Sequence, residues 1–295
     1  MASSNWGFSA SLASFPFAEE AFLLLAGAVV WATPALGEDR LPIFDTHLHY
    51  SRDAWREYPP LIVQQKLDAA HVVRALVSSS PDDGSLTLHN EDPDRFSPVL
   101  RPYRDGVTLS NWSHDAATPD YIAGRLKRGI YKGIGEFHLH GSDDAATPVV
   151  RKLARMAVEH GILLHVHSYA APVAKLFELE PELTILWAHA GFEAPETVRR
   201  MVEKHPRLFV EVALRSGEIL GGGGEIPENW KRLLSDHTDR FMIGTDTYRS
   251  FHWEAYGEIV AGHRRWLALM PPEKAKAIAF RNAARLFGAG KKLPQ

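Results

Sequence analysis

The sequence of 295 residues contains no cysteine. That absence excludes disulfide bonds, thiolate metal ligands and a cysteine nucleophile. A large excess of charge is also missing: the formal net charge is -3 at pH 7, so there is no electrostatic case for binding nucleic acid or an anionic membrane surface. The composition is otherwise that of a globular protein, with 45% hydrophobic and 23% charged residues. Histidine is the residue type that stands out, with 15 copies.

The first forty residues differ from the rest of the chain. Residues 21–31 form an apolar run that is too short to span a bilayer and has the length of a signal-peptide core. Small residues follow and match a cleavage site at 35–37, so we expect residues 1–37 to be a signal peptide and the protein to be exported to the periplasm or the medium. Against this expectation, no Lys or Arg precedes Arg40, and Glu19 and Glu20 lie where a positive region belongs. The alternative is an N-terminal extension on a cytoplasmic enzyme.

Residues 38–295 alternate between short apolar runs and longer stretches of helical period, which predicts one α/β domain. The connection over residues 81–93 is expected to consist of turns. The expected strands are 41–46, 72–77, 96–100, 133–139, 162–167, 183–188, 208–214 and 241–245. The expected helices are 53–71, 119–128, 148–160, 171–179, 195–205, 227–235, 253–269 and 272–287. Within the first of these, Pro59-Pro60 must mark a break or a helix start.

Eight strands that each lead into a helix, over about 250 residues, predict a (β/α)8 TIM barrel. The strands are apolar without alternation, as strands of a parallel sheet covered on both faces must be. An open doubly wound sheet is the rival, but no strand is followed by a glycine-rich phosphate loop. Gly221–Gly224 lacks the spacing of such a loop and is expected to give a flexible loop at the active site.

The first strand runs into His47-Leu48-His49. On an extended backbone, residues two apart point to the same side, so both imidazoles are predicted to face one place. Two neutral imidazoles that point to one place form half of a metal site. The alternative is a pair of surface or core histidines without a metal. The ends of the other strands decide between these interpretations.

Metal-binding residue types recur at the carboxyl ends of the expected strands, which is where barrel enzymes place their chemistry. A random distribution would put most of them on helices and loops. The residues are His47, His49, Glu136, His138, His140, His165, His167, His189, Glu211 and Asp246, with Arg215 beside them. The sequence therefore predicts a metal centre at this end of the barrel.

The order of these residues resembles the amidohydrolase superfamily of metal-dependent hydrolases, over residues 41–287. Phe44-Asp-Thr-His-Leu-His49, Phe241-Met-Ile-Gly-Thr-Asp246 and Phe280-Arg-Asn-Ala-Ala-Arg-Leu-Phe-Gly288 look most like its amidohydrolase-2, or amidohydrolase-related, branch. Gly133-Ile-Gly-Glu136 and Val166-His-Ser168 look more like the TatD-like hydrolases. What identifies the superfamily is the occurrence of these motifs in this order.

The resemblance implies a set of metal ligands and a catalytic residue. Asp246 would take a proton from the attacking water and deliver it to the leaving group. Glu136 matches the position at which some members bridge two metals, and the number of ions, one or two, stays open. Zinc is expected for such ligands, with manganese or iron as alternatives. The implied metal set is His47, His49, Glu136, His167, His189 and Asp246.

Substrate contacts are predicted only from position just past the strand ends. Arg215 carries a guanidinium group, which can bind a carboxylate or phosphate. For every residue predicted here, the alternative is that its side chain belongs to ordinary loop structure. His165 is expected to be a packed histidine one layer deeper. The predicted substrate residues are His138, His140, Tyr169 and Arg215, with Arg101, Tyr103, Arg104 and Trp112 as a possible lid. The eight histidines at 71, 89, 114, 160, 205, 237, 252 and 263 are expected to be structural or exposed.

Three functions fit this sequence. The first is a metal-dependent hydrolase that uses metal-activated water on a small-molecule lactone, ester, amide or phosphoester. The second is a metal-dependent decarboxylase of an aromatic or unsaturated acid, which the same branch includes and which would need one metal. The third is a non-catalytic barrel that binds a metal or ligand, against which the complete ligand set argues. In each case the expected partner is a small molecule.

Overall fold

The computed structural model describes residues 40–288, and this part of the chain forms a (β/α)8 barrel, as predicted. The parallel strands pair in sequence order from β1 to β8, and a bridge between Asp45 and Ile243 joins the last strand to the first. The strands are β1 (Ile43–His49), β2 (Val72–Ser78), β3 (Phe96–Leu100), β4 (Gly133–His138), β5 (Leu163–His167), β6 (Ile185–Trp187), β7 (Leu208–Glu211) and β8 (Phe241–Met242). The predicted signal peptide lies outside the described residues.

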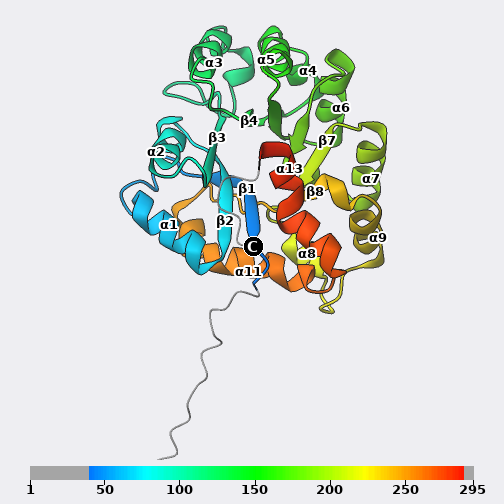
Figure 1. The fold of residues 1–295 in the computed structure, drawn as a ribbon. Coiled ribbons are helices and arrows are strands. Elements are labelled where there is room, and N and C mark those ends of the chain that lie inside the picture. The colour runs from blue at the N-terminus through cyan, green and yellow to red at the C-terminus, as the bar shows by residue number, and fades with distance from the viewer. Residues whose placement is uncertain (1–39, 289–295) are drawn as a thin grey trace, which may run out of the picture. The chain divides into compact units, whose positions relative to one another are not determined.

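Helices surround the ring of strands (Figure 1). The helix α5 buries an apolar stripe: Val149, Val150 and Leu153 are buried, and the Thr147 side chain caps the helix by accepting a hydrogen bond from the Val150 amide at 3.2 Å. The helices are α1 (Pro60–Ala69), α2 (Asp83–Glu91), α3 (Thr118–Leu126), α4 (Ser142–Ala145), α5 (Pro148–Glu159), α6 (Ala170–Leu179), α7 (Pro195–Lys204), α8 (Ser216–Leu220), α9 (Glu228–Asp236), α10 (Ser250–Glu254), α11 (Tyr256–Leu267), α12 (Pro272–Lys276) and α13 (Asn282–Phe287). No helix within residues 40–288 is both long enough and apolar enough to cross a membrane.

An apolar layer fills the amino-terminal end of the barrel. Phe44 of β1, Leu76 of β2 and Met242 of β8 belong to one buried cluster with Phe280 and Phe287 of the C-terminal helical segment. In Figure 1, α13 (red) lies across the strands, and it contacts β1 and β8. Because this layer closes the amino-terminal end of the barrel interior, we expect the functional site at the carboxyl ends of the strands.

The closure between β1 and β8 depends on a buried carboxylate. Asp45 accepts hydrogen bonds from the Thr245 amide at 3.0 Å, the Thr245 hydroxyl at 2.6 Å and the Tyr256 hydroxyl at 3.0 Å. It also accepts one from the His47 amide at 3.1 Å. Burial raises the pKa of Asp45 to about 6, and these donors compensate its ionised form. Asp45 therefore holds the His-x-His segment against the segment after β8, which carries Asp246.

One local prediction was wrong. Residues 81–93 contain the helix α2, whose inner face uses Gly84, Ser85 and Leu88 in place of a full apolar stripe. A Cβ added at Gly84 would lie 2.0 Å from the carbonyl oxygen of Tyr50, so a small residue is needed there. The first helix starts at Pro60, which confirms that Pro59-Pro60 marks a helix start within 53–71, because proline is favoured at a first helical position.

Candidate metal centre

His47 and His49 lie on one face of β1, as the alternation predicted, and both are 1% exposed. Their Nε2 atoms are 3.0 Å apart, whereas Leu48 between them points into the opposite layer and joins the apolar core. The strand thus directs two imidazoles towards one point near its carboxyl end.

Three of the histidines are oriented by a partner at Nδ1. His47 Nδ1 lies 2.8 Å from Oε1 of Glu211, His49 Nδ1 lies 2.9 Å from the carbonyl oxygen of Ser78, and His189 Nδ1 lies 3.1 Å from that of Ala213. An acceptor at Nδ1 places the ring proton there and leaves Nε2 free to bind a metal. All three Nε2 atoms therefore face the centre as potential ligands.

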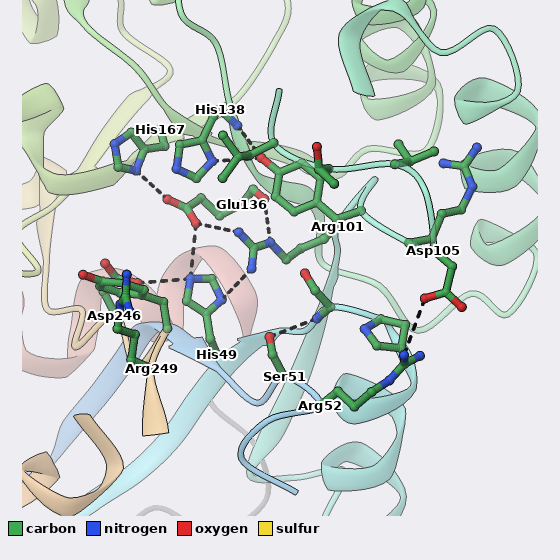
Figure 2. Close-up of a pocket in the computed structure, with 18 of the residues that line it drawn as sticks. His49, Ser51, Arg52, Arg101, Asp105, Glu136, His138, His167, Asp246 and Arg249 are labelled. Carbon is green, nitrogen blue, oxygen red and sulfur yellow. Dashed lines mark hydrogen bonds and ion pairs between the residues drawn. The ribbon is translucent and has the colours of Figure 1, made fainter. Parts of the chain in front are cut away.

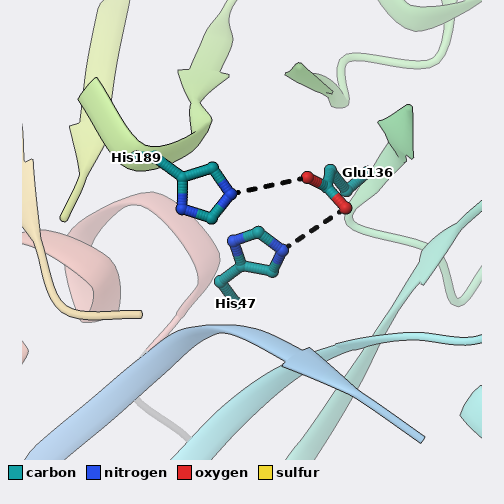
Figure 3. Close-up of side chains that lie close together, drawn as sticks. All are labelled: His47, Glu136 and His189. Carbon is teal, nitrogen blue, oxygen red and sulfur yellow. Dashed lines mark ion pairs between the residues drawn. The ribbon is translucent and has the colours of Figure 1, made fainter. Parts of the chain in front are cut away.

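Glu136, on β4, lies between two groups of imidazoles (Figures 2 and 3). Its Oε2 atom is 3.2 Å from His49 Nε2 and 3.5 Å from His47 Nε2. Its Oε1 atom is 2.8 Å from His167 Nδ1 and 3.8 Å from His189 Nε2. Each carboxylate oxygen thus faces a different pair of histidines.

Asp246 completes the arrangement from the segment after β8. Its Oδ1 atom lies 3.1 Å from His49 Nε2 and 3.5 Å from His47 Nε2, and its Oδ2 atom lies 3.7 Å from His189 Nε2. The structure therefore brings together all six residues that the sequence predicted as metal ligands: His47, His49, Glu136, His167, His189 and Asp246.

The chemistry of this cluster fits a divalent metal ion. Burial alone would lower the pKa of His47, but Glu136, Asp246 and Glu211 raise it well above its ordinary value, which means that this position favours a positive charge. The His189 Nε2 atom is buried without a hydrogen-bond partner. Imidazole and carboxylate are ligands of zinc, manganese and iron, and such an ion would supply both the positive charge and the missing partner.

Two of the predicted ligands have a left-handed backbone. His189 has φ 56° and Asp246 has φ 52°, a conformation that costs non-glycine residues about 1–3 kcal/mol and is concentrated at functional sites. Asp246 is held by a hydrogen bond from its amide to the carbonyl oxygen of His47, and His189 by its own carbonyl, which accepts from Arg215 Nη1 at 2.9 Å. The surrounding structure thus fixes both side chains in place.

A cavity of about 710 Å³ opens above the cluster (Figure 2). His49, Glu136, His167 and Asp246 line it, whereas His47 and His189 lie beneath them with at most 1% exposure. The walls include Arg52, Arg101, Tyr103, Arg104, His138, Phe192, Leu214, Tyr248 and Arg249. A volume of this size suits a small-molecule ligand.

The predicted substrate contacts divide into two groups. His138 lines the cavity, and burial lowers its pKa to about 3, so its ring is neutral at physiological pH. His140 and Tyr169 are exposed and lie outside the cavity lining. Arg215 is 2% exposed and also lies outside the lining. The Arg215 guanidinium is occupied by the carbonyl oxygens of His189 and Glu193, so it supports the β6 loop and is not free to grip a substrate.

Of the residues predicted as a lid, Arg101, Tyr103 and Arg104 line the cavity, whereas Trp112 does not. Trp112 is fully buried and donates from Nε1 to the carbonyl oxygen of His138 at 2.9 Å. Arg101 is 8% exposed and donates from Nε to the carbonyl oxygen of Glu136 at 3.0 Å and from Nη2 to Glu136 Oε2 at 3.2 Å. Arg104 is paired with Asp115 at 2.6 Å. The Gly221–Gly224 segment is likewise absent from the cavity lining, so it is not an active-site loop.

Two further residues, His165 and Glu211, lie at the base of the site. His165 lies one layer deeper, as predicted: its ring is 4.5 Å from that of His47, and burial lowers its pKa well below the ordinary value. Glu211 was noted only as a polar strand end. Burial would raise its pKa, but His47 and His189 lower it to about 2, and its oxygens accept from the amides of His189 and Ala213 at 2.7 and 2.6 Å. The signal that could have found Glu211 is an acidic residue inside an apolar strand.

A (β/α)8 barrel with histidines and carboxylates gathered at the carboxyl ends of its strands is the framework of a metal-dependent enzyme. The chain belongs to the amidohydrolase family, because that family's model, described as Amidohydrolase, matches residues 44–289. It is thus an enzyme of the amidohydrolase superfamily, whose members bind divalent metals. No curated protein matches the sequence at a significant level.

Solved structures with the same fold have low sequence identity to the chain. A probable 2-pyrone-4,6-dicarboxylic acid hydrolase from Acinetobacter baumannii shares 14% identity with a TM-score of 0.58, over 84% of this chain and 100% of that one. A 5-carboxyvanillate decarboxylase from Novosphingobium aromaticivorans, complexed with manganese, shares 14% identity with a TM-score of 0.55, over 85% and 97%. A 4-oxalomesaconate hydratase from Rhodopseudomonas palustris shares 15% identity with a TM-score of 0.53, over 84% and 96%. At these identities the likeness shows the fold alone.

Proposed function

We propose that the protein is a metal-dependent hydrolase of a small-molecule lactone, ester, amide or phosphoester. The observation that carries this proposal is the position of Glu136, whose two oxygens face two different pairs of histidines. A carboxylate in this position can bridge two ions, and paired ions suit the attack of water on an electrophilic carbon or phosphorus. Zinc is the proposed metal, with manganese and iron as alternatives.

Each half of the site would hold one ion. His47, His49 and Asp246 form the first half with Glu136 Oε2, and His167 and His189 form the second half with Glu136 Oε1. When bound, a divalent metal polarises the substrate and lowers the pKa of water towards about 7. The remaining chemistry belongs to the side chains of this chain.

Asp246 is the proposed general base. Burial would raise its pKa, but His47 and His49 lower it well below the ordinary value, so the carboxylate is ionised and able to accept a proton. Asp246 lines the cavity, where it can take a proton from the attacking water and then deliver it to the leaving group. The buried partners Glu211, Ser78 and Ala213 keep the imidazoles in the required orientation.

Decarboxylation remains the alternative reaction, in which one ion would bind the acid and no water would attack. A lactone substrate gains support from the A. baumannii neighbour, because a 2-pyrone is a cyclic ester, whereas the N. aromaticivorans neighbour is a decarboxylase. The position of Glu136 between two histidine pairs favours the two-ion hydrolase.

The test is a substrate panel assayed with zinc-loaded and manganese-loaded protein. The panel contains lactones, carboxylic esters, amides, phosphoesters and aromatic carboxylic acids. The proposal predicts hydrolysis of at least one of the first four classes and loss of that activity in Asp246→Asn. Release of carbon dioxide from an aromatic acid, without hydrolysis of any other class, would overturn it.

A further inference from the structure

His138, the last residue of β4, is an imidazole in the cavity that the proposed metal set does not use. Its main chain is held on both sides: its amide donates to the Tyr103 hydroxyl at 2.8 Å, and its carbonyl oxygen accepts from Trp112 Nε1 at 2.9 Å. Its ring stacks on that of His167 at a centroid distance of 4.1 Å. The ring is therefore fixed next to a predicted metal ligand.

The Tyr103 hydroxyl is the hydrogen-bond partner of the His138 ring at Nδ1. That hydroxyl accepts a hydrogen bond from the His138 amide and also lies 2.8 Å from His138 Nδ1. A hydroxyl has a single proton to donate, and within residues 40–288 Nδ1 is the acceptor recorded for it. An arrangement in which the hydroxyl accepts from the amide and donates to Nδ1 uses its proton and leaves the ring proton of His138 on Nε2. In this tautomer His138 brings a neutral N–H donor to the cavity that it lines.

His138 is poorly placed to bind a metal ion together with His167. A ligand atom of each of Glu136, His138 and His167 lies within 4.8 Å of the others, which is the spacing of a potential metal site. However, the two rings are stacked with an interplanar angle of 22°, so their in-plane lone pairs run nearly parallel. An ion must lie about 2.0–2.1 Å from each nitrogen, close to both ring planes. Stacked rings do not meet that requirement.

We propose that His138 donates a hydrogen bond from Nε2–H to the substrate oxygen that becomes negatively charged in the reaction, and that Tyr103 is the positioning residue that maintains this tautomer. The inference rests on the proposed hydrolase function and deepens it, because each proposed substrate class develops negative charge on an oxygen when water attacks. No proton leaves His138: the N–H group acts as a preorganised dipole, as neutral histidine does in other active sites.

The first test measures an oxyanion probe, so it does not depend on knowing the substrate. Calorimetry with inorganic phosphate on the zinc-loaded protein gives a dissociation constant for the wild type, His138→Ala and the control His140→Ala, whose exposed ring lies outside the cavity lining. His138→Ala is expected to bind phosphate roughly 10- to 100-fold more weakly, the range for losing a hydrogen bond to a charged group. His140→Ala should equal the wild type, and zinc per chain should be the same in all three.

Several outcomes would overturn the inference: equal phosphate affinity in wild type and His138→Ala, no phosphate binding by the wild type, or loss of zinc from His138→Ala, which would make His138 a ligand. A second measurement examines the tautomer directly. Imidazole-optimised ¹⁵N–¹H spectra should show His138 protonated at Nε2 and bare at Nδ1 in the wild type, and a tautomer mixture in Tyr103→Phe. Protonation at Nδ1 in the wild type would contradict the proposal whether or not His138→Ala folds.

The kinetic readout separates donation from mere packing. On any ester or lactone that the wild type hydrolyses, His138→Ala should lower kcat by about 100-fold with little change in KM, and His138→Gln, which keeps an N–H donor, should recover part of the loss. An equal kcat in His138→Ala would overturn the inference. If the wild type hydrolyses nothing, the proposed function fails, whereas the phosphate and tautomer measurements still decide the role of His138 as an oxyanion donor.

Discussion

The Nδ1 atom of His47 lies 2.8 Å from Oε1 of Glu211, and both side chains are buried. Because Glu211 is ionised, the imidazole is the donor and its proton is on Nδ1. The Nε2 atom of His47, which faces Glu136 and Asp246, is then the nitrogen that would bind a metal. Glu211, which is outside the proposed metal set, thus orients one of the proposed ligands.

Replacing Glu211 with Gln should weaken metal binding without removing a ligand. Glu211 now accepts hydrogen bonds from two backbone N–H groups, and the NH₂ of a glutamine would face one of them, donor against donor. The side chain would then have to move away from the position in which it orients His47. We expect zinc affinity to fall about 10- to 100-fold, measured by competition with a chromophoric chelator. The control is Glu203→Gln, at an exposed position on α7. Equal affinity in Glu211→Gln and the wild type would show that the contact is dispensable.

Asp246→Asn should abolish most of the hydrolytic activity. An amide cannot accept the proton of the attacking water, so kcat on the best panel substrate should drop about 100- to 10,000-fold. The matched control is Asp236→Asn, an exposed carboxylate at the end of α9. Unchanged kcat in Asp246→Asn, with metal still bound, would remove Asp246 from the mechanism.

Arg215→Ala should act on stability and not on substrate binding. Its guanidinium holds the carbonyl oxygens of His189 and Glu193, and without it these buried groups lose their donor. We expect the free energy of unfolding, from urea titration, to fall by about 2–4 kcal/mol. KM should stay within about twofold of the wild type for anionic and neutral substrates alike. A selective rise in KM for anionic substrates, at unchanged stability, would reinstate Arg215 as a substrate contact.

His263 should make stability depend on pH. It is fully buried between the Gly244 carbonyl and the Ser216 hydroxyl, and burial lowers its pKa to about 4 from the ordinary 6.5. The unfolded chain therefore binds a proton at a higher pH than the folded chain, so stability falls as the pH drops from 6.5 towards 4.

The shift corresponds to at most about 3 kcal/mol across that window. His263→Gln keeps a donor and an acceptor but does not titrate, so its free energy of unfolding should fall less than that of the wild type between pH 6.5 and 4.5. Parallel curves for the two proteins would mean that other groups cause the acid sensitivity.

Much of the fold could be predicted from the sequence, because parallel strands that are buried on both faces are apolar throughout. The helix α2 could not be predicted, because its inner face contains the small residues Gly84 and Ser85. At Gly84 the carbonyl oxygen of Tyr50 leaves no room for a larger side chain. Hydrophobic periodicity contains no signal for such packing.

Position at a strand end identified the residues of the metal centre but not the direction of every neighbouring side chain. His47 and His49 are constrained by strand alternation, so their convergence was predictable. Arg101 and Arg215 lie on irregular segments, where alternation does not fix the direction of a side chain. Each donates to the carbonyl oxygen of a residue from another part of the barrel, Glu136 and His189, and only the assembled barrel shows these contacts.

The most direct test of the account is the number of metal ions per chain. Elemental analysis of protein dialysed against zinc should give close to two ions per chain, and Glu136→Gln should bring the value down to one or fewer, because the bridge between the two halves is lost. A value near one in the wild type would contradict the two-ion site and favour the decarboxylase alternative. A value near zero would contradict the metal centre itself.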